Sequence, residues 1–285
     1  MLQWYYLAII SSVFISGATI LEKKMLKKEY ASAFAATSSL LIALATLVFI
    51  PFLKLDISMV DWLLIYIVAL ITTVSNVLVA RTFRHGTLSA TSPLNATLPT
   101  LFIIVLAYIF LKELLAPVQY IGIAITICAI IMLLFGRNSK YDFASTKYKY
   151  LIFVNAAITG VSSIIFKYLL GVTTPITFMI LSQVFVAINM VVYMSLKYGG
   201  VREVLANTKV YSKEMGAIVV LTVGYMFFYY TAVVTGPISL ASPLKNSILV
   251  VITMLSGAFI FKEPDVRRKI LLSALILLGA CLMIL

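Results

Sequence analysis

Apolar residues follow one another in long stretches along most of this chain, and charged residues gather in short segments between them. A helix needs about 20 apolar residues to cross roughly 30 Å of hydrocarbon. Within the stretches, apolar and polar positions do not alternate as the strands of a membrane barrel require, so the pattern predicts helices. The ten predicted spans are residues 2–21, 31–53, 62–80, 88–111, 117–135, 150–170, 174–196, 215–235, 237–261 and 270–285.

Composition supports a bilayer as the surrounding medium. Of the 285 residues, 62% are hydrophobic and 11% are charged, against roughly 45–50% and 25% in soluble domains. The net charge of +12 could indicate a nucleic-acid partner, but nearly all of the 22 Lys and Arg residues lie in short connections between apolar stretches. Membrane orientation explains that distribution better, and no nucleic-acid partner is expected.

A repeat relates the two parts of the chain. The segment from Gly86 to Glu113 aligns without a gap with the segment from Gly236 to Glu263, at a constant offset of 150. The identities include Ser92-Pro93-Leu94 with Ser242-Pro243-Leu244, and Lys112-Glu113 with Lys262-Glu263. A weaker match pairs Lys23 with Lys167.

The repeat divides the chain into two halves of five spans, residues 1–136 and 150–285, joined by the polar linker 137–149. Because five is odd, the second half enters the membrane from the opposite side. The predicted fold class is therefore an all-α membrane protein of ten helices in two inverted repeats around a central cavity. Such repeats are common in carriers that work by alternating access.

Loop charges predict the orientation. Only Lys54 and Lys112 lie in loops on the side of Met1, whereas nearly all other cations lie in loops on the opposite side. The positive-inside rule then predicts both termini outside and the first loop in the cytoplasm. The expected location is the plasma (inner) membrane.

The paired Ser-Pro-Leu segments, each followed by an apolar run that ends in Lys-Glu, resemble the drug/metabolite transporter superfamily and, within it, the EamA family. The resemblance implies a ten-helix carrier whose cavity is lined mainly by the first four helices of each half, with the fifth and tenth helices peripheral. Many EamA-like proteins are thought to keep both termini in the cytoplasm, and here the loop charges predict the reverse.

Two lysines inside predicted spans are candidate substrate-binding residues. Lys245 lies about nine residues into the ninth span, roughly 13 Å along a helix axis, where a cation is costly unless water, a counter-charge or a substrate meets it. Lys167, near the end of the sixth span, is predicted to share a vestibule with it, although snorkelling explains Lys167 equally well. Both loosely resemble the basic residues of phosphate-carrying relatives, but Asn246 stands where a second base would follow Lys245.

Uncharged polar residues inside the spans either line the cavity or tie helices together. Tyr225 and Tyr229 are four residues apart, hence on one helix face, where packing is the simpler explanation and contact with substrate the other. Pro93 and Pro243 occupy matching positions and are candidate hinges. The remaining candidate substrate-binding residues are Asn76, Ser92, Asn95, Asn155 and Gln183.

No enzymatic, metal or cofactor motif is found in the sequence. All ten acidic residues are predicted in loops or at span ends, so uniport or exchange is the simpler mechanism, with Glu22 as the one candidate proton carrier. The lone His85 and the two cysteines lie far from any second ligand. A membrane enzyme would need clustered acidic or metal-binding residues.

The preferred function is a secondary transporter for a small polar metabolite, with amino acids and other carboxylates ahead of organic phosphates and drugs. A channel and a polytopic membrane enzyme remain as alternatives from other classes. The sequence leaves the oligomeric state open and is compatible with a monomer.

Overall fold

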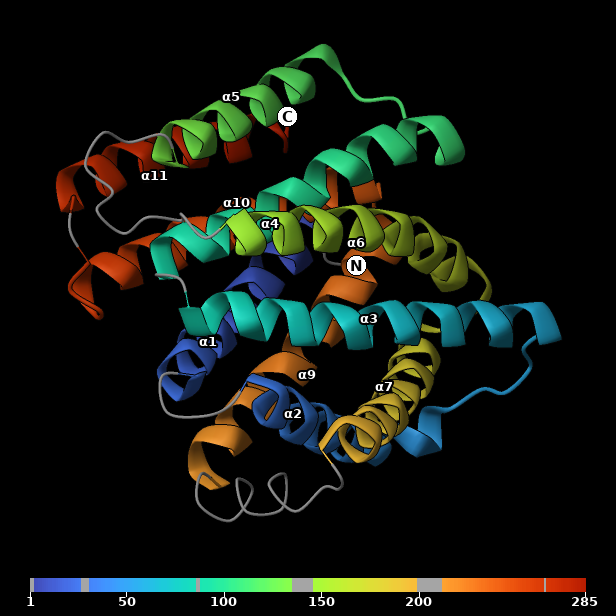
Figure 1. The fold of residues 1–285 in the computed structure, drawn as a ribbon. Coiled ribbons are helices and arrows are strands. Elements are labelled where there is room, and N and C mark those ends of the chain that lie inside the picture. The colour runs from blue at the N-terminus through green and yellow to red at the C-terminus, as the bar shows by residue number, and fades with distance from the viewer. Residues whose placement is uncertain (1–2, 27–30, 86–87, 135–145, 199–211, 264) are drawn as a thin grey trace.

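The computed structural model describes residues 3–26, 31–85, 88–134, 146–198, 212–263 and 265–285, and these residues form helices joined by short connections (Figure 1). A short η helix continues α2 (η1, Leu47–Phe52) and α4 (η2, Ala107–Leu111). The α-helices are α1 (Trp4–Leu26), α2 (Ala31–Thr46), α3 (Met59–His85), α4 (Leu88–Leu106), α5 (Pro117–Leu134), α6 (Thr146–Val172), α7 (Pro175–Tyr198), α9 (Ser212–Thr235), α10 (Ile238–Phe259) and α11 (Val266–Leu282).

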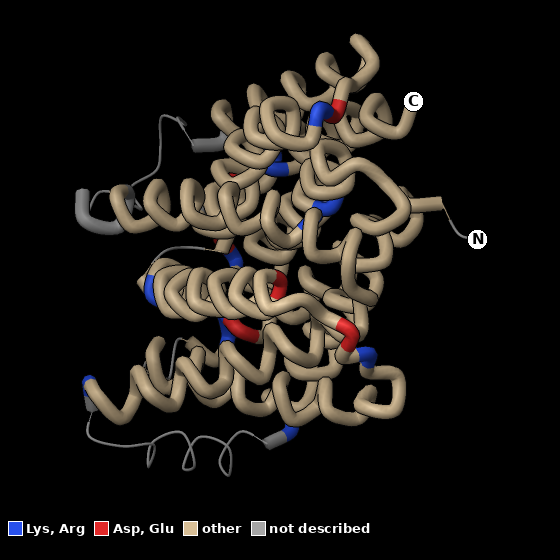
Figure 2. Tube along the Cα trace, turned by 90° about the vertical axis from the view of Figure 1, so that its right-hand side faces the viewer, with Lys and Arg blue, Asp and Glu red and all other residues tan. Residues whose placement is uncertain are grey.

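Eight helices of the described chain are long and apolar enough to cross a membrane, which makes the protein a multi-pass integral membrane protein. They correspond to all the predicted spans except the fifth and tenth. α5 and α11 are shorter, and α11 opens with Arg267, Arg268 and Lys269, which reduces its apolar length. Figure 2 shows how few charged residues lie along the tube.

The helices form a bundle in which partners from the two parts of the chain lie side by side. α4 packs along α10, α1 along α9, and α2 along α7. α5 and α11 pack on each other at one edge of the bundle in Figure 1. There, a Cβ added to Gly279 would approach the Thr126 hydroxyl to 2.4 Å and the Gly122 carbonyl oxygen to 2.6 Å, so small residues allow the close contact.

Nearby side chains cap the starts of α7 and α3. At the start of α7 the Thr174 hydroxyl accepts a hydrogen bond from the Thr177 amide at 3.1 Å, and Pro175 occupies the first turn, where no amide donor is needed. At the start of α3 the Ser58 hydroxyl accepts from the Asp61 amide and donates to its carboxylate.

The two Lys-Glu pairs of the repeat end their helices in the same way. Lys112 (φ 56°) and Lys262 (φ 52°) both adopt the left-handed conformation that closes many helix C-termini. The next amide then bonds six residues back, Glu113 to the Ala107 carbonyl and Glu263 to the Gly257 carbonyl. This turn sends each glutamate side chain back toward the bundle.

Each glutamate caps a helix in the other half of the chain. Glu263 accepts hydrogen bonds from the Leu88 and Ser89 amides at the start of α4, at 2.9 and 3.2 Å. Glu113 accepts from the Ile238 and Ser239 amides at the start of α10, at 3.1 and 2.9 Å. A carboxylate there satisfies orphan amide donors and favours the positive end of the helix dipole. The two contacts, called here the reciprocal caps, join matching positions of the repeat.

Two buried or partly buried lysines bind carbonyl oxygens at the C-terminal ends of α3 and α9, the helices that come directly before α4 and α10. The Lys23 ammonium, in α1, donates to the Phe83 carbonyl near the end of α3. The Lys167 ammonium, in α6, donates to the carbonyls of Val233 and Gly236 at the end of α9, at 2.5 and 2.8 Å. Val233 matches Phe83 at the offset of 150, so the weak sequence match between the two lysines corresponds to the same contact in both halves.

Candidate functional site

A cavity of about 400 Å³ lies among the helices, a size usual for small-molecule sites. Among the described residues it is lined by α1–α4, α6, α7, α9 and α10, and by none from α5 or α11. These are the eight helices that the resemblance implied. Its lining is rich in hydroxyl and amide groups, with Glu22 and Lys245 as the charged side chains of the described wall. The uncharged polar lining residues are Thr19, Ser38, Ser39, Thr72, Asn76, Ser92, Asn95, Thr159, Ser162, Ser163, Ser182, Gln183, Thr222, Tyr225, Tyr229, Tyr230 and Asn246.

Lys245 lies in the cavity wall, partly buried, over two stacked tyrosine rings. Its ammonium is 4.4 Å from the ring centroid of Tyr229 and 5.4 Å from that of Tyr225. The rings are 5.6 Å apart and inclined by 17°. The Tyr229 hydroxyl donates to Ser242 at 3.1 Å, which fixes its ring. Cation–π attraction holds the ammonium at the wall without neutralising its charge.

Four of the predicted uncharged residues line the same cavity, but they differ in how many of their hydrogen-bonding groups are already engaged within the protein. Ser92 shares a 2.8 Å hydrogen bond with Thr253 and so ties α4 to α10. The Asn76 amide approaches the Ser39 hydroxyl at 3.4 Å, and Gln183 is buried at the wall. Asn95, which matches Lys245 in the repeat, donates its amide to Thr82 and leaves its buried carbonyl oxygen without a partner.

Lys167 and Asn155, both predicted to bind substrate, are not among the described residues that line the cavity. Lys167 points to the end of α9, where carbonyls that lack intrahelical donors attract a cation. It therefore shares no vestibule with Lys245. Asn155 is 3% exposed in α6, outside the lining, with its carbonyl oxygen unpartnered. The partners of Lys167 lie at the end of another helix, α9, where a single sequence gives no indication of them.

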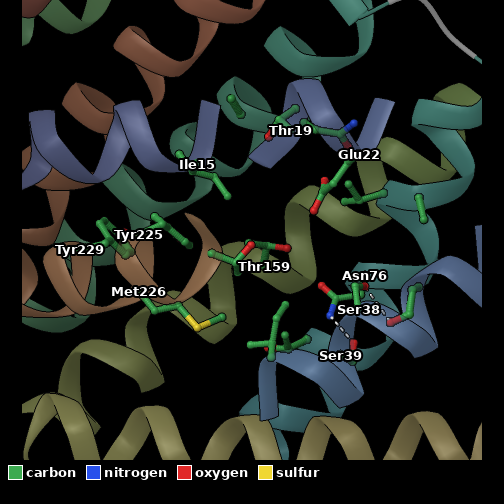
Figure 3. Close-up of a pocket in the computed structure, with 18 of the residues that line it drawn as sticks. Ile15, Thr19, Glu22, Ser38, Ser39, Asn76, Thr159, Tyr225, Met226 and Tyr229 are labelled. Atoms are coloured by element: carbon green, nitrogen blue, oxygen red, sulfur yellow. Dashed lines mark hydrogen bonds between the residues drawn. The ribbon is translucent and has the colours of Figure 1, made fainter. Parts of the chain in front are cut away.

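Glu22 is a wall residue that the sequence placed only at the edge of the first span. α1 continues to Leu26, so Glu22 lies within the helix and faces the cavity one turn after Thr19. Figure 3 shows its carboxylate directed into the pocket, with Asn76, Ser38 and Ser39 across from it. The lysines that follow Glu22 are typical of a loop, so the sequence did not predict that Glu22 lies within α1.

Pro93 and Pro243, the predicted hinges, lie inside α4 and α10, and both helices continue through them. Next to Pro243, the Asn246 amide donates to the Ala96 carbonyl at 2.9 Å and to the Thr100 hydroxyl at 2.7 Å. Hence the residue that follows Lys245 joins α10 to α4, and its amide is not free for substrate.

The fold and the cavity define a helical membrane protein with a small-molecule-sized cavity between its helices. Residues 2–135 match the model of the EamA-like transporter family, which confirms the resemblance inferred from the repeat motifs. The matched residues are thus similar to membrane transporters of the drug/metabolite transporter superfamily, and this similarity supports a non-enzymatic function.

Comparison with solved structures shows the same fold. One protein, described only as "Crystal structure of protein", superposes with a TM-score of 0.67 at 16% identity, over 97% of this chain and 96% of that one. No curated protein matches the chain.

Proposed function

We propose that the protein is a secondary transporter that moves a small polar metabolite with a carboxylate group, amino acids included, across the membrane by alternating access. The observation that carries the proposal is the Lys245 ammonium in the wall of a polar cavity, with no acidic partner among the described residues. An unpaired cation at such a site favours an anionic group of a ligand.

The proposed topology is ten spans in two inverted repeats, residues 1–136 and 150–285. The reciprocal caps support it, because equivalent glutamates bind equivalent helix starts across the halves. The matching contacts of Lys23 and Lys167 support it further. Two ends built alike are what a carrier needs if it is to open to either side in turn.

In the proposed site Lys245 binds the carboxylate, while Tyr225 and Tyr229 hold the lysine in place. Asn76, Asn95 and Gln183 supply hydrogen bonds, and Ser92 shapes the wall between α4 and α10. Pro93 and Pro243 act as hinges, since each removes a helical hydrogen bond at a matching place. Lys167 and Asn155 are left out of the site.

Organic phosphates are less well supported than carboxylates. A phosphate carries up to two negative charges, and Lys167 is already engaged with the end of α9. A drug carrier is the other alternative within the superfamily. For a channel, the test is conductance in a planar bilayer, and for an enzyme it is turnover without translocation.

The test is uptake by proteoliposomes that contain the purified protein. The panel comprises amino acids, organic acids, sugar phosphates and cationic drugs, each with empty liposomes as control. Saturable uptake of amino acids or carboxylates, lost in the Lys245→Ala protein, is the expected result. Saturable uptake of sugar phosphates or drugs alone would overturn the proposal.

A further inference from the structure

We propose that Glu22 binds a substrate ammonium group, so that the cavity selects zwitterions with one amine and one carboxylate over plain carboxylates. This inference rests on the proposed function and deepens it, because Lys245 holds the other end of the same molecule. It concerns a residue that the sequence had left at the edge of a span.

The first observation is that both charges of the described wall are unmatched. Glu22 and Lys245 line one cavity, yet they form no ion pair with each other, and the single ion pair of the described residues joins Lys269 to Glu263. Lys245 contacts tyrosine faces. No hydrogen bond reaches the Glu22 carboxylate from any described residue, although Lys23 beside it donates to the Phe83 carbonyl.

An unpaired carboxylate inside a membrane-spanning bundle is costly. A counter-ion on each charged group removes this cost. A ligand with a single negative charge would satisfy Lys245 and leave Glu22 exposed to the same unfavourable environment. A zwitterion satisfies both groups. The pair of opposite charges in the wall therefore favours ligands that carry both an amine and a carboxylate over ligands that carry only a carboxylate.

The second observation is the position of the two groups. In Figure 3, Tyr225 and Tyr229 lie on one side of the cavity and Glu22 lies on the other, with Thr159 between them in this view. Because Lys245 sits over the two tyrosines, its charge belongs to their side. A molecule in the cavity can therefore direct its carboxylate toward α10 and its amine toward α1.

The third observation is a set of hydroxyl oxygens in the cavity wall that includes Glu22. An ammonium donates three hydrogen bonds and accepts none. The Thr159 and Thr222 hydroxyls are buried at the wall and have no hydrogen-bond partner. Thr19 lies one turn before Glu22 on the same face of α1. Hydroxyl acceptors and a carboxylate in the wall of one cavity can together accept the hydrogen bonds of an amine.

The experiment compares matched substrates in proteoliposomes. One series holds α-amino acids and ω-amino acids of increasing length. The other holds the carboxylic acids of the same length that lack the amine. For the wild-type protein, competition should be at least about tenfold stronger for the best zwitterion than for its matched acid, because hydrogen bonds to a charged group are among the stronger ones.

Variants assign this preference to Glu22. Glu22→Gln keeps the side-chain shape and removes the charge. It should weaken transport of the zwitterion by about tenfold or more, and transport of the matched acid should not fall. Glu214→Gln, which removes an acidic charge from α9 outside the cavity lining, is the control and should keep the wild-type preference. Thermal unfolding of each variant in detergent checks that the fold is retained.

Three results would overturn the inference. Equal transport of zwitterions and matched acids by the wild-type protein would show that the amine is not recognised, and this comparison needs no variant. Equal loss of both substrates in Glu22→Gln, together with loss of uptake driven by a proton gradient, would assign Glu22 to proton coupling. Transport of neither substrate class would refute the proposed function itself, and the inference with it.

Discussion

At the residue scale, Lys245 dominates the chemistry of the cavity. Its replacement by alanine should lower carboxylate transport by roughly 10- to 100-fold, because a charge-assisted hydrogen bond is worth about 1.5–3 kcal/mol. Lys245→Arg should recover only part of the rate, since guanidinium and ammonium differ in shape and hydration. Uptake assays at matched protein levels measure both, and wild-type rates for the alanine protein would remove Lys245 from the site.

The tyrosine beneath Lys245 offers a finer test. Tyr229→Phe keeps the ring under the ammonium and removes only the hydrogen bond to Ser242. Tyr229→Leu removes the ring as well, and with it a cation–π contact of about 0.5–2 kcal/mol. The apparent affinity for substrate should therefore fall much more in the leucine protein than in the phenylalanine protein. Equal effects of the two changes would mean that the hydroxyl matters and the ring face does not.

Single residues also show where sequence reasoning stops. Lys245 could be singled out because a lysine deep in an apolar stretch is costly wherever the helix faces. Lys167 has the same signature, yet its ammonium meets the end of α9, and only the packing of two distant helices decides this. Glu22 was hidden for the opposite reason, since the lysines after it resemble the start of a loop although α1 continues through them.

At the scale of elements, the reciprocal caps connect α4 and α10 to the opposite halves of the chain. Glu113→Gln and Glu263→Gln should each lower the stability of the protein by about 0.5–2 kcal/mol, the usual loss for a helix cap. Thermal unfolding in detergent measures the change. Asp56→Asn, in the exposed connection between η1 and α3, is the control for loss of a charge alone.

The two caps need not be equal. Glu263 also pairs with Lys269 at 3.3 Å, so its replacement leaves a buried cation without a partner, and we expect it to be the more harmful. If both variants unfold at the wild-type temperature, the caps contribute nothing measurable to stability.

The extent of the elements was largely predictable, because an apolar run fixes the length of a membrane helix within a few residues. α2 and α4 begin at or within a residue of their predicted starts, and the η segments complete their spans. Other helices extend beyond their predicted spans, α1 and α3 at their C-terminal ends and α11 at its N-terminal end, where it starts at Val266 and includes three basic residues. Helix bonding continues past the point where hydropathy falls.

At the scale of the whole molecule, the proposed orientation has a direct test. Tags at the two termini should both be accessible to antibodies on intact cells, and a tag in the linker 137–149 should be reached only after the cells are permeabilised. The reason is the concentration of Lys and Arg in the loops opposite Met1. Protected termini would reverse the orientation and leave the fold unchanged.

The reciprocal caps also constrain how the protein can be made. The amides that open α4 belong to residues 88 and 89, and their partner, Glu263, is 175 residues further along the chain from Leu88. At a synthesis rate of about 5–20 residues per second, the helix waits on the order of ten seconds or more before its cap exists. Until then the start of α4 depends on water or lipid head groups for its hydrogen bonds. A chain released before Glu263 is made would carry this unfinished helix, which gives quality-control proteases a local difference between the complete protein and its fragments.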